Sequence, residues 1–268
     1  MLIKLLRKIH CLWLYNHKKW ESKFLFFISG QKFLNAKVLA SYKNKFAGKR
    51  CFIVCNGPSL RVEDLDLLHD RKEYTFGCNW ISKIFPNTRW RPTFYSMMDE
   101  GGMFDLYNVM NEVPGVHFYR SDSYLVTRNI ASPCVWVNVN GDRKLLESPK
   151  FSKEADHLIY AIGTITFAML ELASYMGFSK IYIIGCDNKF GLERKKDGTV
   201  VYNNVASHFK EAQVKNDVTT ASGTWEMNIA YACARKASDE SPDFTIYNAT
   251  RGGHLEAFER VDFDYLFN

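Results

Sequence analysis

Short apolar runs alternate with helix-forming patterns along most of the chain. The runs are continuous, which is typical of parallel strands that are buried on both faces. They predict strands over Arg50–Val54, Tyr74–Cys78, Pro92–Met97, Val116–Tyr119, Val135–Val139, Lys180–Gly185 and Phe244–Tyr247.

Three helices are predicted between these strands. The clearest spans Gly163–Met176, where apolar residues recur at helical spacing and Gly177 follows as a C-terminal cap. The others span Glu63–His69 and Thr224–Lys236, and the polar segment Leu192–Ser207 is expected to be a mobile loop. Strands that alternate with helices in this way predict an α/β fold with a parallel sheet flanked by helices.

Charge divides the chain into two parts. Residues 1–50 hold twelve Lys and Arg against Glu21 alone and carry a charge of +11. The whole chain of 268 residues carries +6, so residues 51–268 carry −5. A basic N-terminal segment before a mildly acidic remainder does not indicate a nucleic-acid partner. It indicates that the segment binds an anionic surface. We therefore expect a basic segment over residues 1–47 and one large domain over residues 48–268.

The basic segment is also rich in apolar and aromatic residues. Leu, Ile, Trp and Phe interleave with Lys and Arg from Leu2 to Phe27. This is typical of an amphipathic helix that lies in a membrane surface, although a helix docked on the protein's own core is the alternative. No run of about 18 uncharged apolar residues exists, so we predict no membrane span and a peripheral position on the inner face of the cell membrane.

Seven cysteines are scattered without a CxxC pair. Several lie in apolar runs, where a thiol behaves as a small hydrophobic group. The set favours a reduced cytoplasm over a disulfide framework, and its spacing predicts no zinc site.

Three segments at predicted strand ends or helix starts are candidates for chemistry, because ligands of parallel sheets bind beyond the carboxyl ends of the strands. Asn56-Gly57-Pro58-Ser59-Leu60 can form a tight turn with exposed amides, or an ordinary strand-to-helix turn. Gly163-Thr164 opens the best helix, where Thr164 could simply be an N-terminal cap.

The third segment combines a carboxylate and an imidazole. Asp187 leaves a strand end, where it can bond a ribose or substrate hydroxyl or orient a base. His208 lies on the polar loop and is a candidate general base near neutral pH. His254, after Gly252-Gly253, is the rival candidate.

These segments resemble two related families. Cys55–Leu60 is similar to the Gly-Asn-Gly-Pro-Ser-Leu loop of the bacterial sialyltransferases of glycosyltransferase family 42. It is also similar to the loop of the MptE-like family, which includes archaeal hydroxymethylpterin diphosphokinases and flagellin glycosylation factors. Ser207-His208-Phe209 stands where the sialyltransferases carry Ser-His-Tyr with their catalytic base. The resemblance covers roughly residues 49–262, is closer to the MptE-like group, and includes Asn79, Trp90–Asp99, Gly163–Thr164, Ile181–Asp187 and Tyr247–Gly253.

The resemblance implies a Rossmann-like sheet, a GT-A-like variant, with a site for a nucleotide sugar. His208 would take the acceptor proton, and Asp187 would assist. The nucleotide and sugar would be held by Asn56, Gly57, Pro58, Ser59, Asn79, Asp99, Gly163, Thr164 and Tyr202.

The sequence differs from the sialyltransferases at two points, so the resemblance does not indicate which sugar is transferred. Cys55 replaces the first Gly of the loop and adds bulk there. Only Tyr202 is present where the sialyltransferases use a tyrosine pair to stabilise the leaving phosphate.

The leading hypothesis is a glycosyltransferase. It would move a sugar from a nucleotide donor, CMP-linked by preference and sialic-acid-like or otherwise acidic, to a glycan or lipid-linked glycan of a capsule or lipopolysaccharide. The transfer would be inverting and independent of metal, with no cofactor beyond the donor. One alternative is a hydroxymethylpterin diphosphokinase that uses ATP and Mg²⁺ on Asp99, Glu100 and Asp187. Another is a membrane-tethered nucleotide sensor without turnover, and the oligomeric state stays open.

Overall fold

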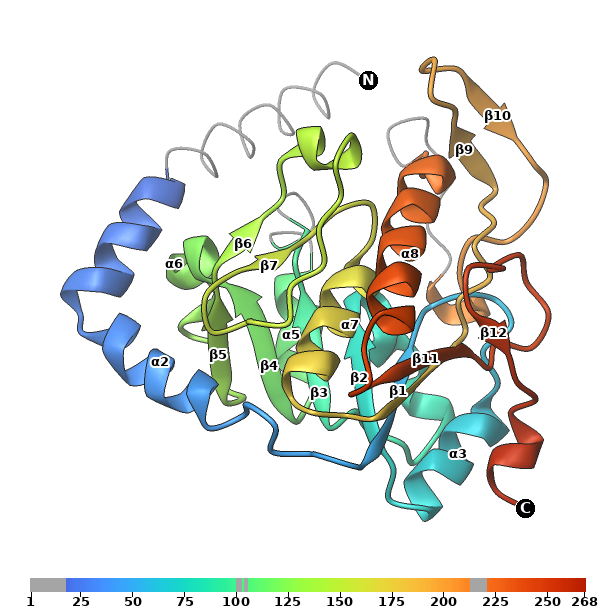
Figure 1. Ribbon diagram of the computed structural model, residues 1–268, viewed down its shortest axis with the longest axis horizontal. Coiled ribbons are helices and arrows are strands. Elements are labelled where there is room, and N and C mark those ends of the chain that lie inside the picture. The colour runs from blue at the N-terminus through green and yellow to red at the C-terminus, as the bar shows by residue number, and fades with distance from the viewer. Residues whose placement is uncertain (1–17, 100–102, 104–105, 213–220) are drawn as a thin grey trace.

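The computed structural model describes residues 18–99, 103, 106–212 and 221–268 (Figure 1). Within these residues the core is one sheet of eight strands, and every pairing in it is parallel. The strands are β1 (Arg50–Val54), β2 (Tyr74–Cys78), β3 (Phe94–Met97), β4 (Val116–Arg120), β5 (Cys134–Val137), β8 (Lys180–Ile184), β11 (Thr245–Asn248) and β12 (Glu259–Arg260).

The order of the strands reverses in the middle of the sheet. The spatial order is β12-β11-β8-β1-β2-β3-β4-β5, so the chain first builds outward from β1 to β5 and then returns to the other side of β1. The loops that follow β1 and β8 therefore leave the sheet in opposite directions. Such a reversal opens a crevice at the carboxyl ends of the two strands.

Helices cover both faces of the sheet. Alternate residues of β1 point to opposite sides: Cys51 and Ile53 face one apolar cluster, and Phe52 and Val54 face the other. The first cluster includes α7 (Ile165–Tyr175) and α8 (Thr224–Asp239), and the second includes α3 (Val62–Asp70), the 3₁₀ helix η1 (Asn79–Asn87) and α5 (Tyr107–Glu112). The predicted α/β architecture is confirmed. The strands form continuous apolar runs because they are buried on both faces.

The segment Leu192–Ser207, expected to be a mobile loop, is in part a hairpin. β9 (Leu192–Arg194) pairs antiparallel with β10 (Val200–Tyr202), and the Lys195 amide donates to the Thr199 carbonyl across the turn. Two valines and a tyrosine give β10 its β-propensity. The polar residues around them led to the prediction of a loop.

The remaining described elements are short. They are β6 (Val139–Asn140), β7 (Ile159–Tyr160), α6 (Tyr124–Thr127), η2 (Ser121–Ser123), η3 (Arg143–Leu146), η4 (Lys210–Ala212) and η6 (Asp264–Leu266).

Two helices precede the sheet. Residues 18–28 are helical, and α2 (Gln31–Ala40) follows and packs against β5 at the edge of the sheet (Figure 1). The predicted helical character of the basic segment is confirmed over these residues, whereas residues 1–17 lie outside the described part of the chain. Among the described helices, none combines the length and the apolar character that crossing a bilayer requires.

A fully buried carboxylate fixes the segment that enters α7. Glu171 accepts hydrogen bonds from the backbone amides of Ser152 and Tyr160, each at 2.6 Å. Burial raises the pKa of Glu171, since no basic side chain compensates its charge in these contacts. The two amides are thereby satisfied inside the protein, and the chain from β7 to α7 is held in place.

We expect Glu171→Gln to lower the free energy of unfolding by about 1–3 kcal/mol, because its NH₂ group would face one of the two amide donors. Urea unfolding of this variant and of Glu154→Gln, an exposed control, measures the difference. Equal stability of the two variants would contradict this role of Glu171.

Candidate functional site

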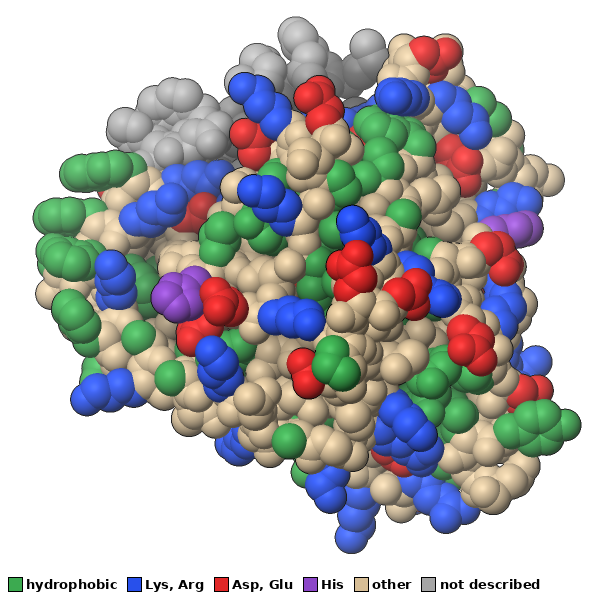
Figure 2. All heavy atoms as spheres, in the orientation of Figure 1, with side chains coloured by type: hydrophobic (Ala, Val, Ile, Leu, Met, Phe, Trp, Pro, Cys, Tyr) green, Lys and Arg blue, Asp and Glu red, His purple; other side chains and the backbone are tan. Residues whose placement is uncertain are grey.

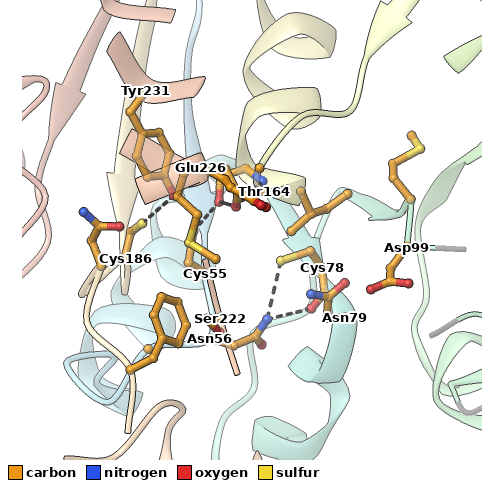
Figure 3. Close-up of a pocket in the computed structure, with 18 of the residues that line it drawn as sticks. Cys55, Asn56, Cys78, Asn79, Asp99, Thr164, Cys186, Ser222, Glu226 and Tyr231 are labelled. Atoms are coloured by element: carbon orange, nitrogen blue, oxygen red, sulfur yellow. Dashed lines mark hydrogen bonds between the residues drawn. The ribbon is translucent and has the colours of Figure 1, made fainter. Parts of the chain in front are cut away.

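A cavity of about 690 Å³ opens at the carboxyl edge of the sheet, at the strand reversal. Its size lies within the usual range for small-molecule sites. The loops after β1, β2, β3 and β8 form one side, and the start of α7 and the first turns of α8 form the other (Figure 3). Eight of the predicted site residues line it: Asn56, Gly57, Asn79, Asp99, Gly163, Thr164, Asp187 and His208.

The loops after β1 and β8 are bonded directly to each other. The Gly57 amide donates to the Gly185 carbonyl at 2.8 Å, and Asp187 Oδ2 accepts from the amide and hydroxyl of Ser59 at 3.1 and 2.8 Å. A Cβ atom on Gly57 would lie 2.0 Å from Asp187 Oδ2 and 2.5 Å from the Gly185 oxygen. Gly57 is therefore required by the contact between the loops, and its amide and that of Ser59 are already engaged by protein acceptors.

His208 lies beside the first loop. The amide of its neighbour Phe209 donates to the Asn56 carbonyl at 2.9 Å, and both His208 and Asn56 line the cavity. Burial lowers the pKa of His208, so the imidazole is neutral at pH 7 and can accept a proton. The rival His254 is exposed and lies outside the cavity lining; its amide donates to the Asp187 carbonyl at 2.8 Å.

Three asparagine side chains bring unpaired acceptors to the cavity wall. Asn56, Asn79 and Asn188 each have a buried Oδ1 atom without a hydrogen-bond partner among the described residues. Two of the side chains are held through their NH₂ groups: Asn56 Nδ2 donates to the Cys78 carbonyl at 3.1 Å, and Asn188 Nδ2 donates to Asn228 Oδ1 at 2.8 Å. Buried acceptors are normally satisfied, so these oxygens are suited to hydroxyl or amino groups of a ligand.

Thiols from three adjacent strand ends form the floor. Cys55, Cys78 and Cys186 follow or end β1, β2 and β8, and Figure 3 shows them side by side. Cys186 Sγ lies 3.2 Å from the Tyr231 hydroxyl. A hydrogen bond that Cys55 donates to Cys186, together with burial, raises the pKa of Cys55, and burial raises that of Cys78 to about 12. The floor is thus uncharged at these two positions, and Cys55, in place of the expected Gly, belongs to it.

Sequence analysis missed the cations of the site, because nothing in their local sequence marks them. Arg120, at the end of β4, is buried and bonded to Asp122 at 2.6 and 2.9 Å. Arg143 forms an ion pair with Glu226 between η3 and α8. Lys189, after β8, lines the cavity and has no ion-pair partner among the described residues, so it is the cation best placed to meet a phosphate.

The remaining predicted residues have structural surroundings of their own. Thr164 is the N-cap of α7 and accepts from the Thr166 amide at 3.3 Å, and a Cβ on Gly163 would lie 2.6 Å from the Glu226 carbonyl. Pro58 and Ser59 do not belong to the cavity lining. Tyr202, on β10, does not belong to it either, and 62% of its surface is exposed. The hairpin therefore separates Tyr202 from the other candidates.

The fold and the cavity define an α/β protein with a ligand crevice at the carboxyl edge of its parallel sheet. A family model described as 6-hydroxymethylpterin diphosphokinase MptE-like matches residues 28–192, which is more than half of the chain. The chain belongs to the MptE-like family, as its motifs predict. No curated protein matches it.

Among solved structures, the chain is similar to the MAf glycosyltransferase from Magnetospirillum magneticum AMB-1. The TM-score is 0.50 at 17% sequence identity, over 87% of this chain and 38% of that one. The chain thus spans well under half of the length of that protein. The likeness concerns the fold.

We expect Gly57→Ala to destabilise the protein by about 3 kcal/mol, because the added methyl group would overlap Asp187 and Gly185. Gly141→Ala is the matched control, since a Cβ there would meet only the Ala161 carbonyl at 3.6 Å. Thermal unfolding of both variants tests the contact. An unchanged Tm for Gly57→Ala would show that the loops can separate.

Because the pKa of His208 is lowered, we expect its imidazole to titrate below the usual pH range of histidine. Its NMR Cε1–H resonance, assigned by loss in His208→Gln, should have a midpoint below 6.5. Because the unfolded chain then binds the proton more readily, this residue's contribution to stability is present above pH 6.5 and is lost as the pH falls through the folded pKa. A midpoint at or above 6.5 would contradict a neutral imidazole at this position.

Proposed function

We propose that the protein is a glycosyltransferase with a Rossmann-like, GT-A-like fold that takes its sugar from a nucleotide donor. The observation that carries the proposal is the position of a half-buried neutral imidazole, His208, beside the Asn56 loop in one cavity. The likeness of the fold to a solved glycosyltransferase supports it. The proposed acceptor is a glycan or a lipid-linked glycan.

The donor would be held mainly by acceptor groups and one cation. The unpaired oxygens of Asn56, Asn79 and Asn188 would bond ribose and sugar hydroxyls and an exocyclic amino group. Cytosine presents such an amino group, which agrees with the CMP-linked donor that the resemblance favours. Lys189, together with the positive end of the α7 dipole, would stabilise the phosphate.

The proposed reaction is a single displacement. The acceptor hydroxyl oxygen bonds to the anomeric carbon while the bond from that carbon to the phosphate oxygen breaks, and the nucleotide leaves with the electron pair. The acceptor proton passes to His208, a transfer that contributes about 10²–10⁴-fold. Attack from the face opposite the phosphate inverts the anomeric configuration, and no step requires a metal ion.

The second candidate is diphosphoryl transfer, because the matching family model is named for a diphosphokinase. Mg²⁺ would need carboxylates, and Asp99, Asp187 and Glu226 line the cavity. Asp187 is bonded to Ser59, and Glu226 is paired with Arg143, so both would have to exchange partners. These contacts favour the glycosyltransferase.

We expect His208→Ala to lower kcat by at least 10²-fold and to leave nucleotide affinity within a few-fold. The assay is release of free nucleotide from CMP-, UDP- and GDP-linked sugars with cell-envelope glycolipid as acceptor. His254→Ala is the control and should retain activity, since His254 lies outside the cavity lining.

Two results would count against the proposal. Retained turnover in His208→Ala would remove this residue from the mechanism. Activity that EDTA abolishes, with ATP and a hydroxymethylpterin as substrates, would establish the diphosphokinase in its place.

A further inference from the structure

The helix over residues 18–28 and α2 are together called the helix pair. Both helices point apolar side chains outward. Seven large hydrophobic side chains are between 45% and 70% exposed: Trp20, Phe24, Phe27, Ile28, Phe33, Leu34 and Val38. Figure 2 shows hydrophobic side chains projecting from the edge of the molecule where the helix pair lies in Figure 1. A helix at a water-facing surface has the opposite polarity, so this outer face is suited to an apolar partner.

Polar residues take inward positions of the same helices. Asn35 donates to the Trp136 carbonyl at 2.6 Å and accepts from the Trp136 amide at 2.7 Å, and thereby covers the outer edge of β5. Ser22 Oγ accepts from the Leu125 amide at 3.0 Å. Phe26 packs on Tyr124 and Trp136, with ring centroids 5.2 and 5.9 Å apart. These contacts fix the pair to the domain and leave its apolar face outside.

Cations border the apolar face. Exposed Lys18, Lys23, Lys32 and Lys37 lie on the helix pair, where Glu21 is the one acidic residue. Lys32 Nζ is 5.5 Å from the centre of the Phe27 ring. An apolar stripe between lysines complements a layer with anionic headgroups above hydrocarbon.

The helix pair is also connected to the rim of the cavity. Lys19 forms an ion pair with Asp122 at 3.8 Å, and Asp122 holds Arg120, which lines the cavity. A surface that contacts the first turn of residues 18–28 would therefore lie close to the cavity. This position suits an acceptor that is anchored in a lipid layer.

We propose that the helix pair docks on the surface of an anionic phospholipid bilayer. Trp20, Phe24 and Phe33 enter the headgroup layer, and the flanking lysines contact lipid phosphates. The proposal does not depend on the reaction that the cavity performs.

Co-sedimentation of the full chain with vesicles tests the proposal. We expect binding to phosphatidylcholine vesicles that contain 30% phosphatidylglycerol, and weak binding to phosphatidylcholine alone. Lys23→Gln/Lys32→Gln/Lys37→Gln should lower the partition coefficient by about fivefold per lysine, or on the order of 100-fold together. Trp20→Ser/Phe24→Ser/Phe33→Ser should lower it at least tenfold.

Tyr265→Ala, which removes another highly exposed aromatic ring, is the matched control and should bind as the unmodified chain does. All these variants should keep the same nucleotide-induced thermal shift, so loss of docking is distinguished from failure of the proposed function. Equal partitioning into both kinds of vesicle would overturn the proposal. So would a dimer in sedimentation velocity that the aromatic substitutions convert to a monomer, because a second copy would then cover the face.

Discussion

The contact between the loops after β1 and β8 is the constraint on which the site depends. The strand order reverses there, so the two loops would separate if nothing joined them. They are joined by the Gly57 amide, by Ser59 and by Asp187, in a space too small for a Cβ at residue 57. A third segment is attached through the bond from Phe209 to Asn56. This arrangement brings His208, distant in sequence, to the crevice.

The same constraint decides which groups remain for a ligand. Two backbone amides of the Asn-Gly-Pro-Ser loop donate hydrogen bonds within the protein, so they do not form a phosphate-binding loop. The group that the loop offers to a ligand is the acceptor Asn56 Oδ1. The cavity wall combines unpaired amide oxygens, neutral thiols and a neutral imidazole, with Lys189 as the cation without an ion-pair partner among the described residues. Such a wall suits a ligand that has many hydroxyl groups and a phosphate at one position. It also suits proton transfer from that ligand to His208.

The sequence predicts the sheet well because its strands are buried on both faces and form continuous apolar runs; Tyr74–Cys78 has the same bounds in the structure. The strand order follows from contacts between distant segments, which no local pattern records. Arg120 and Arg143 were missed for the same reason. The family resemblance, and no local pattern, assigned His208 to the same site as the Asn56 loop. Tyr202 was expected near the phosphate, but hairpin formation places it on an exposed strand. The amphipathic pattern of the head indicated helices, whereas which face points outward depends on Asn35 and Ser22.

The most direct test of a nucleotide site that works without metal is a thermal-shift titration of the full chain in EDTA. CMP, CDP, UDP, GDP and ATP are compared, each with and without added Mg²⁺. We expect at least one nucleotide, CMP first, to stabilise the protein by about 2.7 kcal/mol at 100 times its dissociation constant, with no change on adding Mg²⁺. Stabilisation by none of them, or by ATP only when Mg²⁺ is present, would contradict a nucleotide-sugar site in this crevice.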